Sequence, residues 1–265
     1  MKDLVTKGYI VIPDFLTAAD IEYLLADYEH SKQVNQPEDR LYTIYPYSIE
    51  AYNYLHEKMS GIIKQVAQET DINADVIIKP SGLAGYFCVD DVNYGWHQDV
   101  EPYLKWGAAY NTLNFWIPLI KPKEDKDGID VVPFDKLPDQ TPFFDMGGSS
   151  LLIRDNTTIV YNLETNVTTK LDFNIDDYKT SISCKPGDLV LMRGDILHQT
   201  QEVEDYRVAL SIRTANGNIQ ISRDRFFGGS DRKQKRINTD KHFEHYVKTF
   251  KSSEKEVMTL YELEG

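Results

Sequence analysis

The spacing of apolar residues along the chain changes near residue 71. Before that point, apolar side chains recur every three to four residues over 17–30 and 49–69, which predicts two helices. Thr17 is expected to cap the first helix, with Asp20 in the capping position three residues later. A short strand at 9–12 precedes it and is ended by Pro13. The first quarter of the chain is therefore predicted to be mainly helical.

After residue 71 the pattern becomes one of short apolar runs separated by glycine, proline and polar turns. Strands are expected at 76–79, 85–89, 114–120, 158–161, 167–173, 181–184, 189–192, 196–200, 207–213 and 218–222. The run from 121 to 148 is too long for a plain connection, so it should cover another part of the molecule or contain short strands. A helix is expected at 240–250. The hairpin of 158–161 and 167–173 should turn at 164–166.

Two helices followed by many short strands, without regular alternation of strand and helix, favour a mostly β fold. We expect an antiparallel sandwich or barrel with helices packed on one side. The whole chain, 1–265, is interpreted as one domain. It would consist of N-terminal helices at about 17–70, a β core at about 76–222 and a C-terminal helix at about 240–250.

Composition narrows the classes of partner. The formal net charge is −13, from 42 acidic and 29 basic residues, which argues against nucleic acid and anionic membranes as partners. Cys88 and Cys184 form no C-x-x-C motif and are expected to be buried free thiols. No signal peptide or membrane span is expected, so a cytoplasmic location is the default expectation. The oligomeric state is left open.

Two histidines fall at strand ends in the β half. His97 lies in "NYGWHQDVE", two residues before Asp99. Side chains at i and i+2 of a strand point the same way, about 6.6 Å apart at the backbone, and can converge on one ion. His198 lies in "CKPGDLVLMRGDILHQT" and would have to approach from a distant strand. An isolated H-x-D motif also arises by chance, and His198 could be a satisfied core histidine.

Together, His97, Asp99 and His198 would make a set of two histidines and one carboxylate. Such a set occupies three positions around a metal ion and leaves three open. Nearby, "YRVALSIRT" places Arg207, Ser211 and Arg213 on one strand face. A guanidinium suits two-pronged capture of a carboxylate. The alternative for each arginine is an internal salt bridge, and this alternative is stronger for Arg213.

These stretches, with "GYIVIPDFLTAADIEYLL" near the start and "RVALSIR" near residue 210, resemble a known family. The chain is similar to the iron(II)- and 2-oxoglutarate-dependent oxygenases, in particular their phytanoyl-CoA dioxygenase-like branch, although 121–180 match poorly. The resemblance implies a double-stranded β-helix, also called a jelly roll or cupin-like fold. It also implies Fe(II), 2-oxoglutarate and O2 as cofactor and co-substrates, with His97, Asp99 and His198 as iron ligands.

The resemblance further implies that Arg207 binds the distal carboxylate of 2-oxoglutarate, with Arg213 as the alternative. Ser211 would donate a hydrogen bond there, and Asn114 or Trp116 would line the pocket. Related halogenases have a small residue at the position of Asp99, so this carboxylate favours oxygen transfer over halogenation.

The implied activity is hydroxylation of an unactivated C–H bond in a small molecule, amino-acid-like or a natural-product intermediate, with release of succinate and CO2. Desaturation, ring formation and epimerisation stay open. Candidate substrate residues are Tyr94, Trp96, Glu101 and Arg213. The basic segment 222–236 would be either a lid over an anionic substrate or a solvated loop. The alternatives are a cupin-type metal enzyme such as an isomerase, which needs no 2-oxoglutarate, and a non-catalytic metal-binding module.

Overall fold

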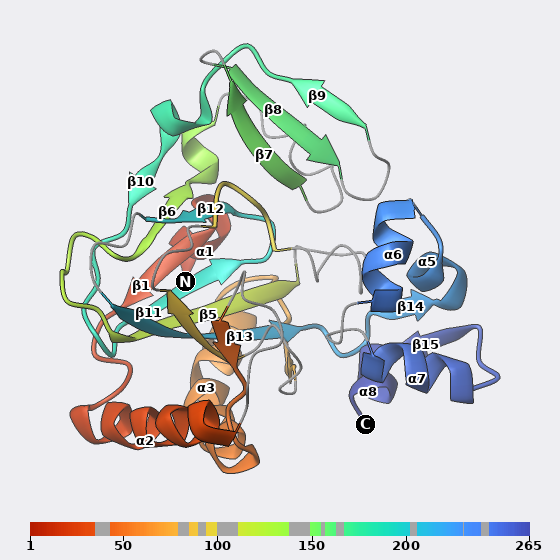
Figure 1. Ribbon diagram of the computed structural model, residues 1–265, viewed down its shortest axis with the longest axis horizontal. Coiled ribbons are helices and arrows are strands. Elements are labelled where there is room, and N and C mark those ends of the chain that lie inside the picture. The colour runs from red at the N-terminus through yellow and green to blue at the C-terminus, as the bar shows by residue number, and fades with distance from the viewer. Residues whose placement is uncertain are drawn as a thin grey trace.

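The computed structural model describes most of the chain and shows two facing antiparallel sheets, with long N-terminal helices against one of them and a second group of helices at the C-terminal end (Figure 1). The described residues are 1–34, 43–78, 85–89, 94–99, 111–137, 149–154, 157–162, 167–201, 206–229, 231–239 and 244–265. Within them, no helix combines the length and the apolar character needed to cross a membrane.

The larger sheet contains seven strands in the order β1-β11-β5-β13-β4-β2, with β3 also paired to β13. In chain order these strands are β1 (Tyr9–Ile12), β2 (Thr43–Tyr45), β3 (Val76–Ile77), β4 (Gly85–Val89), β5 (Thr112–Ile120), β11 (Leu189–Arg193) and β13 (Arg207–Ala215). All of the pairings are antiparallel. The predicted strand at 85–89 has the same bounds in the structure.

The smaller sheet has the order β10-β6-β12. Its strands are β6 (Ile129–Val132), β10 (Thr180–Ser181) and β12 (Leu197–Thr200). An antiparallel bridge between His97 and His198 adds the His97 segment at its edge. From β4 to β13 the chain passes back and forth between the two sheets, which is the topology of a double-stranded β-helix. The predicted fold class is therefore confirmed.

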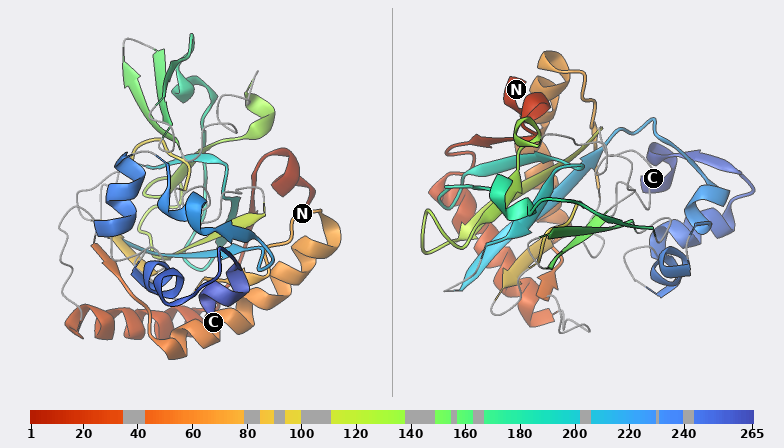
Figure 2. Two further views of the ribbon diagram at one scale, coloured as in Figure 1. Left: turned by 90° about the vertical axis from the view of Figure 1, so that its right-hand side faces the viewer. Right: turned by 90° about the horizontal axis from the view of Figure 1, so that it is seen from above.

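Helices α2 (Ala18–Val34) and α3 (Ile49–Glu69) cover the outer face of the larger sheet (Figures 1 and 2). Alternation along the strands explains this packing. Phe115, Ile117 and Leu210 point to the helix side, whereas Trp116 and Ala209 point between the sheets. Both faces are thus buried, which is why β5 appears in the sequence as a nearly continuous apolar run.

A three-stranded insertion packs against the outer face of the smaller sheet. It consists of β7 (Ser149–Arg154), β8 (Thr157–Asn162) and β9 (Thr168–Lys170), and the short helices η2 (Phe134–Lys136) and η3 (Ile175–Tyr178) flank it. The predicted hairpin is confirmed as β8 and β9, although its turn at 164–166 lies outside the described residues. The predicted strand content of the 121–148 run is confirmed by β6.

The C-terminal residues pack around a second apolar core, to which Ile78 and Ala215 also contribute. Helices α5 (Arg223–Phe227), α6 (Asp231–Thr239), α7 (Glu244–Ser252) and α8 (Leu260–Glu264) surround a ladder of β14 (Gln220–Ser222) and β15 (Val257–Thr259). Phe226, Tyr246 and Phe250 lie in this core. The predicted C-terminal helix corresponds to α7. Within the basic 222–236 segment, the described residues form the end of β14, α5 and the start of α6, so much of it is helical. At the other end, α1 (Lys2–Thr6) precedes β1.

Candidate metal centre

The site begins with the backbone pairing of His97 and His198. Each of these two residues donates its N–H to the carbonyl oxygen of the other, and both N–O distances are 3.0 Å. This reciprocal pairing holds the two imidazoles side by side, with ring centroids 4.3 Å apart. Residues 97 and 198 are distant in sequence, and the β-helix topology brings them together.

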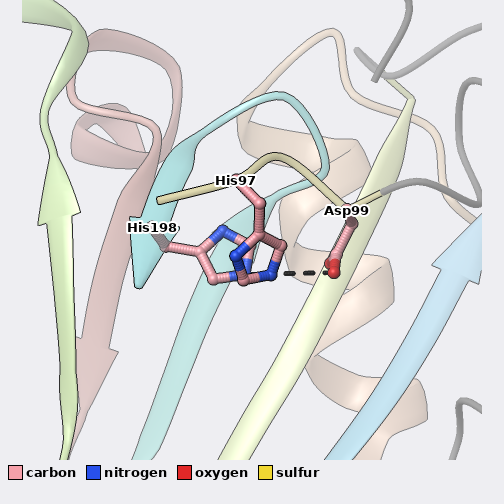
Figure 3. Close-up of side chains that lie close together, drawn as sticks. All are labelled: His97, Asp99 and His198. Atoms are coloured by element: carbon pink, nitrogen blue, oxygen red, sulfur yellow. Dashed lines mark ion pairs between the residues drawn. The ribbon is translucent and has the colours of Figure 1, made fainter. Parts of the chain in front are cut away.

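Asp99 completes the group. One donor atom from each of His97, Asp99 and His198 lies within 4.8 Å of the other two. The carboxylate Oδ1 of Asp99 is 3.9 Å from Nε2 of His198, and Figure 3 shows the three side chains pointing toward one another. In the described part of the chain this is the only cluster of three or more such residues. The i, i+2 spacing therefore has the consequence expected from strand geometry.

Backbone carbonyls set the orientation of both imidazoles. Nδ1 of His97 lies 2.7 Å from the carbonyl oxygen of Gly95, and Nδ1 of His198 lies 3.1 Å from that of Ile196. A ring that donates its Nδ1–H leaves the lone pair of Nε2 available to a metal ion. Burial and the neighbouring His198 lower the pKa of His97 to about 4. His97 is therefore neutral at pH 7, as a metal ligand must be.

The Asp99 carboxylate is buried, and both of its oxygens accept hydrogen bonds. Nη2 of Arg213 donates to Oδ1 at 2.7 Å, and Nδ2 of Asn114 donates to Oδ2 at 3.0 Å. Burial would raise the pKa of Asp99, but the charge of Arg213 outweighs burial and holds the pKa well below its ordinary range. Asp99 is therefore an ionised oxygen donor at neutral pH.

This set of donors fits a ferrous ion. Two imidazole nitrogens and one carboxylate oxygen are the ligands that open non-haem iron(II) sites use. The tied Nδ1 atoms provide the outer hydrogen bonds that such ligands need. Among the described residues, no fourth histidine, cysteine or carboxylate joins the group. These three donors would fill only part of the coordination sphere of an iron ion.

Arg207 lies at the start of β13, where it is 3% exposed. Its Nη1 donates to the carbonyl oxygens of Asp127 and Gly128, at 3.0 and 2.9 Å. Its guanidinium carbon is 5.8 Å from the ring centroid of Trp116. Burial lowers the pKa of Arg207 to about 10, so the side chain stays charged at pH 7.

The charge of Arg207 is only partly neutralised. Its Nε is buried and has no hydrogen-bond partner, and Arg207 forms no ion pair with the described residues. A buried cation without an anionic partner is costly. This arrangement suits an anionic ligand.

The structure brings most of the predicted site residues together. Asn114 and Arg213 contact Asp99 directly. Ser211 is joined to them through Asn114, because its Oγ donates to Oδ1 of Asn114 at 2.9 Å. The ring of Tyr94 is 5.9 Å from that of His97. Trp116 lies beside Arg207, and Glu101 lies outside the described residues.

Trp96 is not brought into this group. It precedes His97 by one residue, so its side chain points to the opposite face of the strand. It is buried against the insertion with Val160 and Ile175, and its Nε1 donates to Oδ1 of Asp176 at 2.8 Å. Here Trp96 has the position of a core residue, which is the ordinary role of a buried aromatic.

Sequence reasoning missed two features of the site. The first is the partner of Arg213: an internal salt bridge was the stronger alternative for this arginine, but the sequence did not identify Asp99, 114 positions away, as the residue that forms it. The second is Gln201, which accepts a hydrogen bond from the N–H of Gly128 at 2.8 Å and so fixes the turn whose carbonyl oxygens bind Arg207. The only signal for Gln201 in the sequence is a polar residue following a buried strand.

No family model matches the sequence, and no curated protein sequence is significantly similar to it. Solved structures do match. The epimerase SnoN, in complex with Fe3+, alpha ketoglutarate and nogalamycin RO, has a TM-score of 0.55 at 12% identity, over 82% of each chain. The non-heme alpha ketoglutarate dependent carbocyclase SnoK from nogalamycin biosynthesis has a TM-score of 0.54 at 14% identity, over 83% of this chain and 84% of its own.

A third match is EvdO2 from Micromonospora carbonacea var. aurantiaca, with a TM-score of 0.54 at 11% identity, over 81% of this chain and 89% of its own. At such low identities the likeness establishes the fold. The chain therefore shares the double-stranded β-helix of non-haem, alpha-ketoglutarate-dependent enzymes.

Proposed function

We propose that this protein is an iron(II)- and 2-oxoglutarate-dependent oxygenase that hydroxylates an unactivated C–H bond of a small molecule, releasing succinate and CO2. The observation that carries the proposal is the pairing of two features in one β-helix. One is an open set of three donors. The other is the buried Arg207, which forms no ion pair within the described part of the chain and has the charge of Asp127 as its main electrostatic counterweight. Two neighbours of the same fold, SnoN and SnoK, are alpha-ketoglutarate-dependent enzymes by name.

In this proposal His97, Asp99 and His198 hold the iron, and Arg207 binds the distal carboxylate of 2-oxoglutarate. Iron, when bound, supplies the activation of O2 coupled to decarboxylation of 2-oxoglutarate. The Nδ1–H of each histidine donates to a backbone carbonyl oxygen, which leaves Nε2 as the metal donor. Trp116 forms an apolar wall beside Arg207 and excludes water from the charge pair, which strengthens it.

Arg207 also separates this proposal from the alternatives. A cupin-type isomerase or a plain metal-binding module would use the two histidines and Asp99 but has no need for the buried Arg207. The phytanoyl-CoA dioxygenase-like branch stays our assignment within the fold. It rests on the order of the "WHQD", "PGDLVLMRGDILHQT" and "RVALSIR" stretches.

For the substrate we propose an amino-acid-like molecule or a natural-product intermediate. Tyr94, whose ring neighbours that of His97, would line its pocket. Glu101 would hold an amine. The basic residues of 222–236 would face an anionic group of the substrate.

The decisive experiment is a turnover screen. The purified protein is supplied with Fe(II), 2-oxoglutarate and O2 against a panel of small molecules, and succinate and products are measured by mass spectrometry. Hydroxylation gives a product one oxygen atom heavier than the substrate. A product of unchanged mass would indicate epimerisation, and one lighter by two hydrogen atoms would indicate ring closure or desaturation. Both outcomes should be measured, because SnoN is named an epimerase and SnoK a carbocyclase.

A binding measurement tests the site without a known substrate. Anaerobic Fe(II) with 2-oxoglutarate is expected to give a weak visible charge-transfer band in the wild type and none in His198→Ala. The absence of a band from the wild type would argue against the proposal.

A further inference from the structure

We propose that Asn114, oriented by Ser211, is a positioning residue for the metal-binding carboxylate, and that it holds Oδ2 so that Asp99 offers Oδ1 alone to the metal. This inference rests on the proposed function, because it assumes that Asp99 is a metal ligand. It assigns Asn114 and Ser211 to the carboxylate, whereas the sequence predicted that they bind 2-oxoglutarate.

The inner face of the larger sheet carries the whole arrangement. Asn114 of β5 and Arg213 of β13 are direct cross-strand partners, and Ser211 lies two residues before Arg213 on the same face. Each of these residues is at most 9% exposed. Asp99 therefore lies over two adjacent strands, and its hydrogen-bond donors come from rigid elements and not from loops.

The direction of the Asn114 amide follows from Ser211. Oγ of Ser211 donates to Oδ1 of Asn114, which turns Nδ2 toward the carboxylate. The reversed amide would place its carbonyl oxygen against Oδ2 of Asp99 and would repel it. The Ser211 hydroxyl thus selects the one amide orientation that can donate a hydrogen bond to Asp99.

The two carboxylate oxygens have different surroundings. Oδ1 lies 3.9 Å from Nε2 of His198, toward the other two donors, and Arg213 contacts it from the sheet side. Oδ2 is taken by Asn114. A carboxylate that loses its outer hydrogen bond can rotate or bind a metal through both oxygens. Fixing Oδ2 would therefore keep a coordination position available to a co-substrate.

The test measures metal binding in the absence of 2-oxoglutarate. Mn(II) alone is titrated into the wild type and the Asn114→Leu, Ser211→Ala and Ser211→Thr variants, and electron paramagnetic resonance reports the free and bound ion. Asn114→Leu is expected to weaken Mn(II) binding roughly 10- to 100-fold, the usual effect of losing an outer hydrogen bond to a ligand, and to change the spectrum of the bound ion. Ser211→Ala should give a smaller loss, and Ser211→Thr should bind as the wild type does.

Thr214→Val is the matched control. Thr214 lies on the same strand as Ser211 but on its opposite face, and its buried Oγ1 has no hydrogen-bond partner among the residues that the structure describes. Its replacement should leave Mn(II) affinity unchanged. If Asn114→Leu does not fold, Ser211→Ala, which removes a single oxygen atom, carries the test.

Two outcomes overturn the inference while the proposed function stands. One is wild-type Mn(II) affinity in both Asn114→Leu and Ser211→Ala. The other is found if these two variants keep the wild-type affinity for Mn(II) but bind 2-oxoglutarate more weakly than the wild type does, which would place both residues on the co-substrate. A wild type that binds no Mn(II) at this site overturns the proposed metal centre and this inference with it.

Discussion

Arg207 and Arg213 lie on the same face of one strand, yet they have different partners. Arg213 forms an ion pair with Asp99, while the hydrogen bonds of Arg207 to the described residues go to the carbonyl oxygens of Asp127 and Gly128. Strand alternation in the sequence places both arginines inside the fold but cannot tell them apart. The contacts favour Arg207 for an external carboxylate, because the charge of Arg213 is already balanced within the protein.

The first prediction follows from this difference. Arg207→Ala should raise the half-saturating concentration of 2-oxoglutarate tens-fold or more, because losing one partner of a buried ion pair costs about 3–5 kcal/mol. Affinity for Mn(II) alone should not change. Calorimetric titration of 2-oxoglutarate into the Mn(II)-loaded protein measures the effect, and Arg207→Lys should fall between Ala and wild type. An unchanged requirement for 2-oxoglutarate would move the role to Arg213.

The sequence predicted the positions of His97 and Asp99 correctly but not that of Trp96. The i, i+2 spacing of His97 and Asp99 predicted their convergence, and the structure has them within reach of His198. The same rule, applied to Trp96, would have placed it on the opposite face. Trp96 became a candidate substrate residue because it adjoins the H-x-D motif in sequence, whereas strand alternation places it in the core.

Trp96 gives the second prediction. Trp96→Phe should lower the free energy of unfolding by about 1–3 kcal/mol, because it removes a hydrogen bond to the Asp176 carboxylate. Mn(II) affinity should stay at the wild-type value although residue 96 adjoins His97. Urea unfolding and the Mn(II) titration measure the two quantities. Combining Trp96→Phe with Asp176→Ala should cost less than the sum of the single changes, and strict additivity would show that the bond contributes nothing.

At the scale of elements, local signals predicted best where one local cause dominates. Thr17 and Asp20 form the predicted reciprocal cap at the start of α2, with hydrogen bonds of 2.8 and 3.3 Å. The strand β7, at 149–154, was not predicted. Its sequence SSLLIR contains apolar residues, but it directly follows a long stretch rich in Pro, Asp, Lys and Gly. The start of the strand could therefore not be identified from the pattern.

The third prediction concerns the same cap. Asp20 also accepts hydrogen bonds from the Tyr54 hydroxyl and from Nζ of Lys58, which joins α2 to α3. Burial would raise the pKa of Asp20, but the bonds from Lys58, Tyr54 and Thr17 outweigh it and lower the pKa. A lowered folded-state pKa adds stability above the unfolded pKa of about 3.9, and this stability is lost as the pH falls toward the folded value.

Asp20→Asn should therefore lower the free energy of unfolding at pH 7 by about 1–3 kcal/mol. The difference from the wild type should shrink when the pH is lowered below about 4. Urea unfolding at a series of pH values measures both effects. Asp3→Asn, which removes an exposed ion pair with Lys7, serves as the control and should change little at any pH. A pH-independent loss in Asp20→Asn would mean that its charge is not the stabilising feature.

At the scale of the whole molecule, the sequence predicted a mostly β fold with helices on one side, and the structure confirms it. The order of strands in each sheet could not be derived from the pattern, because strand pairing depends on contacts far apart along the chain. The resemblance to a known family supplied that topology. The second apolar core, around the C-terminal elements, was also not foreseen, because it joins short elements between 216 and 265 with Ile78 and Ala215, which lie elsewhere in the sequence.

The last prediction uses the stability of the entire fold as the readout. If the metal and 2-oxoglutarate bind only the folded protein, each ligand stabilises the fold. At a ligand concentration of about 100 times the dissociation constant, the gain is about 2.7 kcal/mol. For a chain of this size that corresponds to a rise in Tm of about 5–10 °C.

The control is His198→Ala, because the protein has a net charge of −13 and its surface carboxylates are expected to bind Mn(II) weakly and nonspecifically. This variant keeps the acidic surface but loses one ligand. Calorimetric scans should therefore show most of the Mn(II)-dependent rise in Tm in the wild type alone. Equal shifts in both proteins would mean that Mn(II) stabilises the fold from its surface and not from His97, Asp99 and His198.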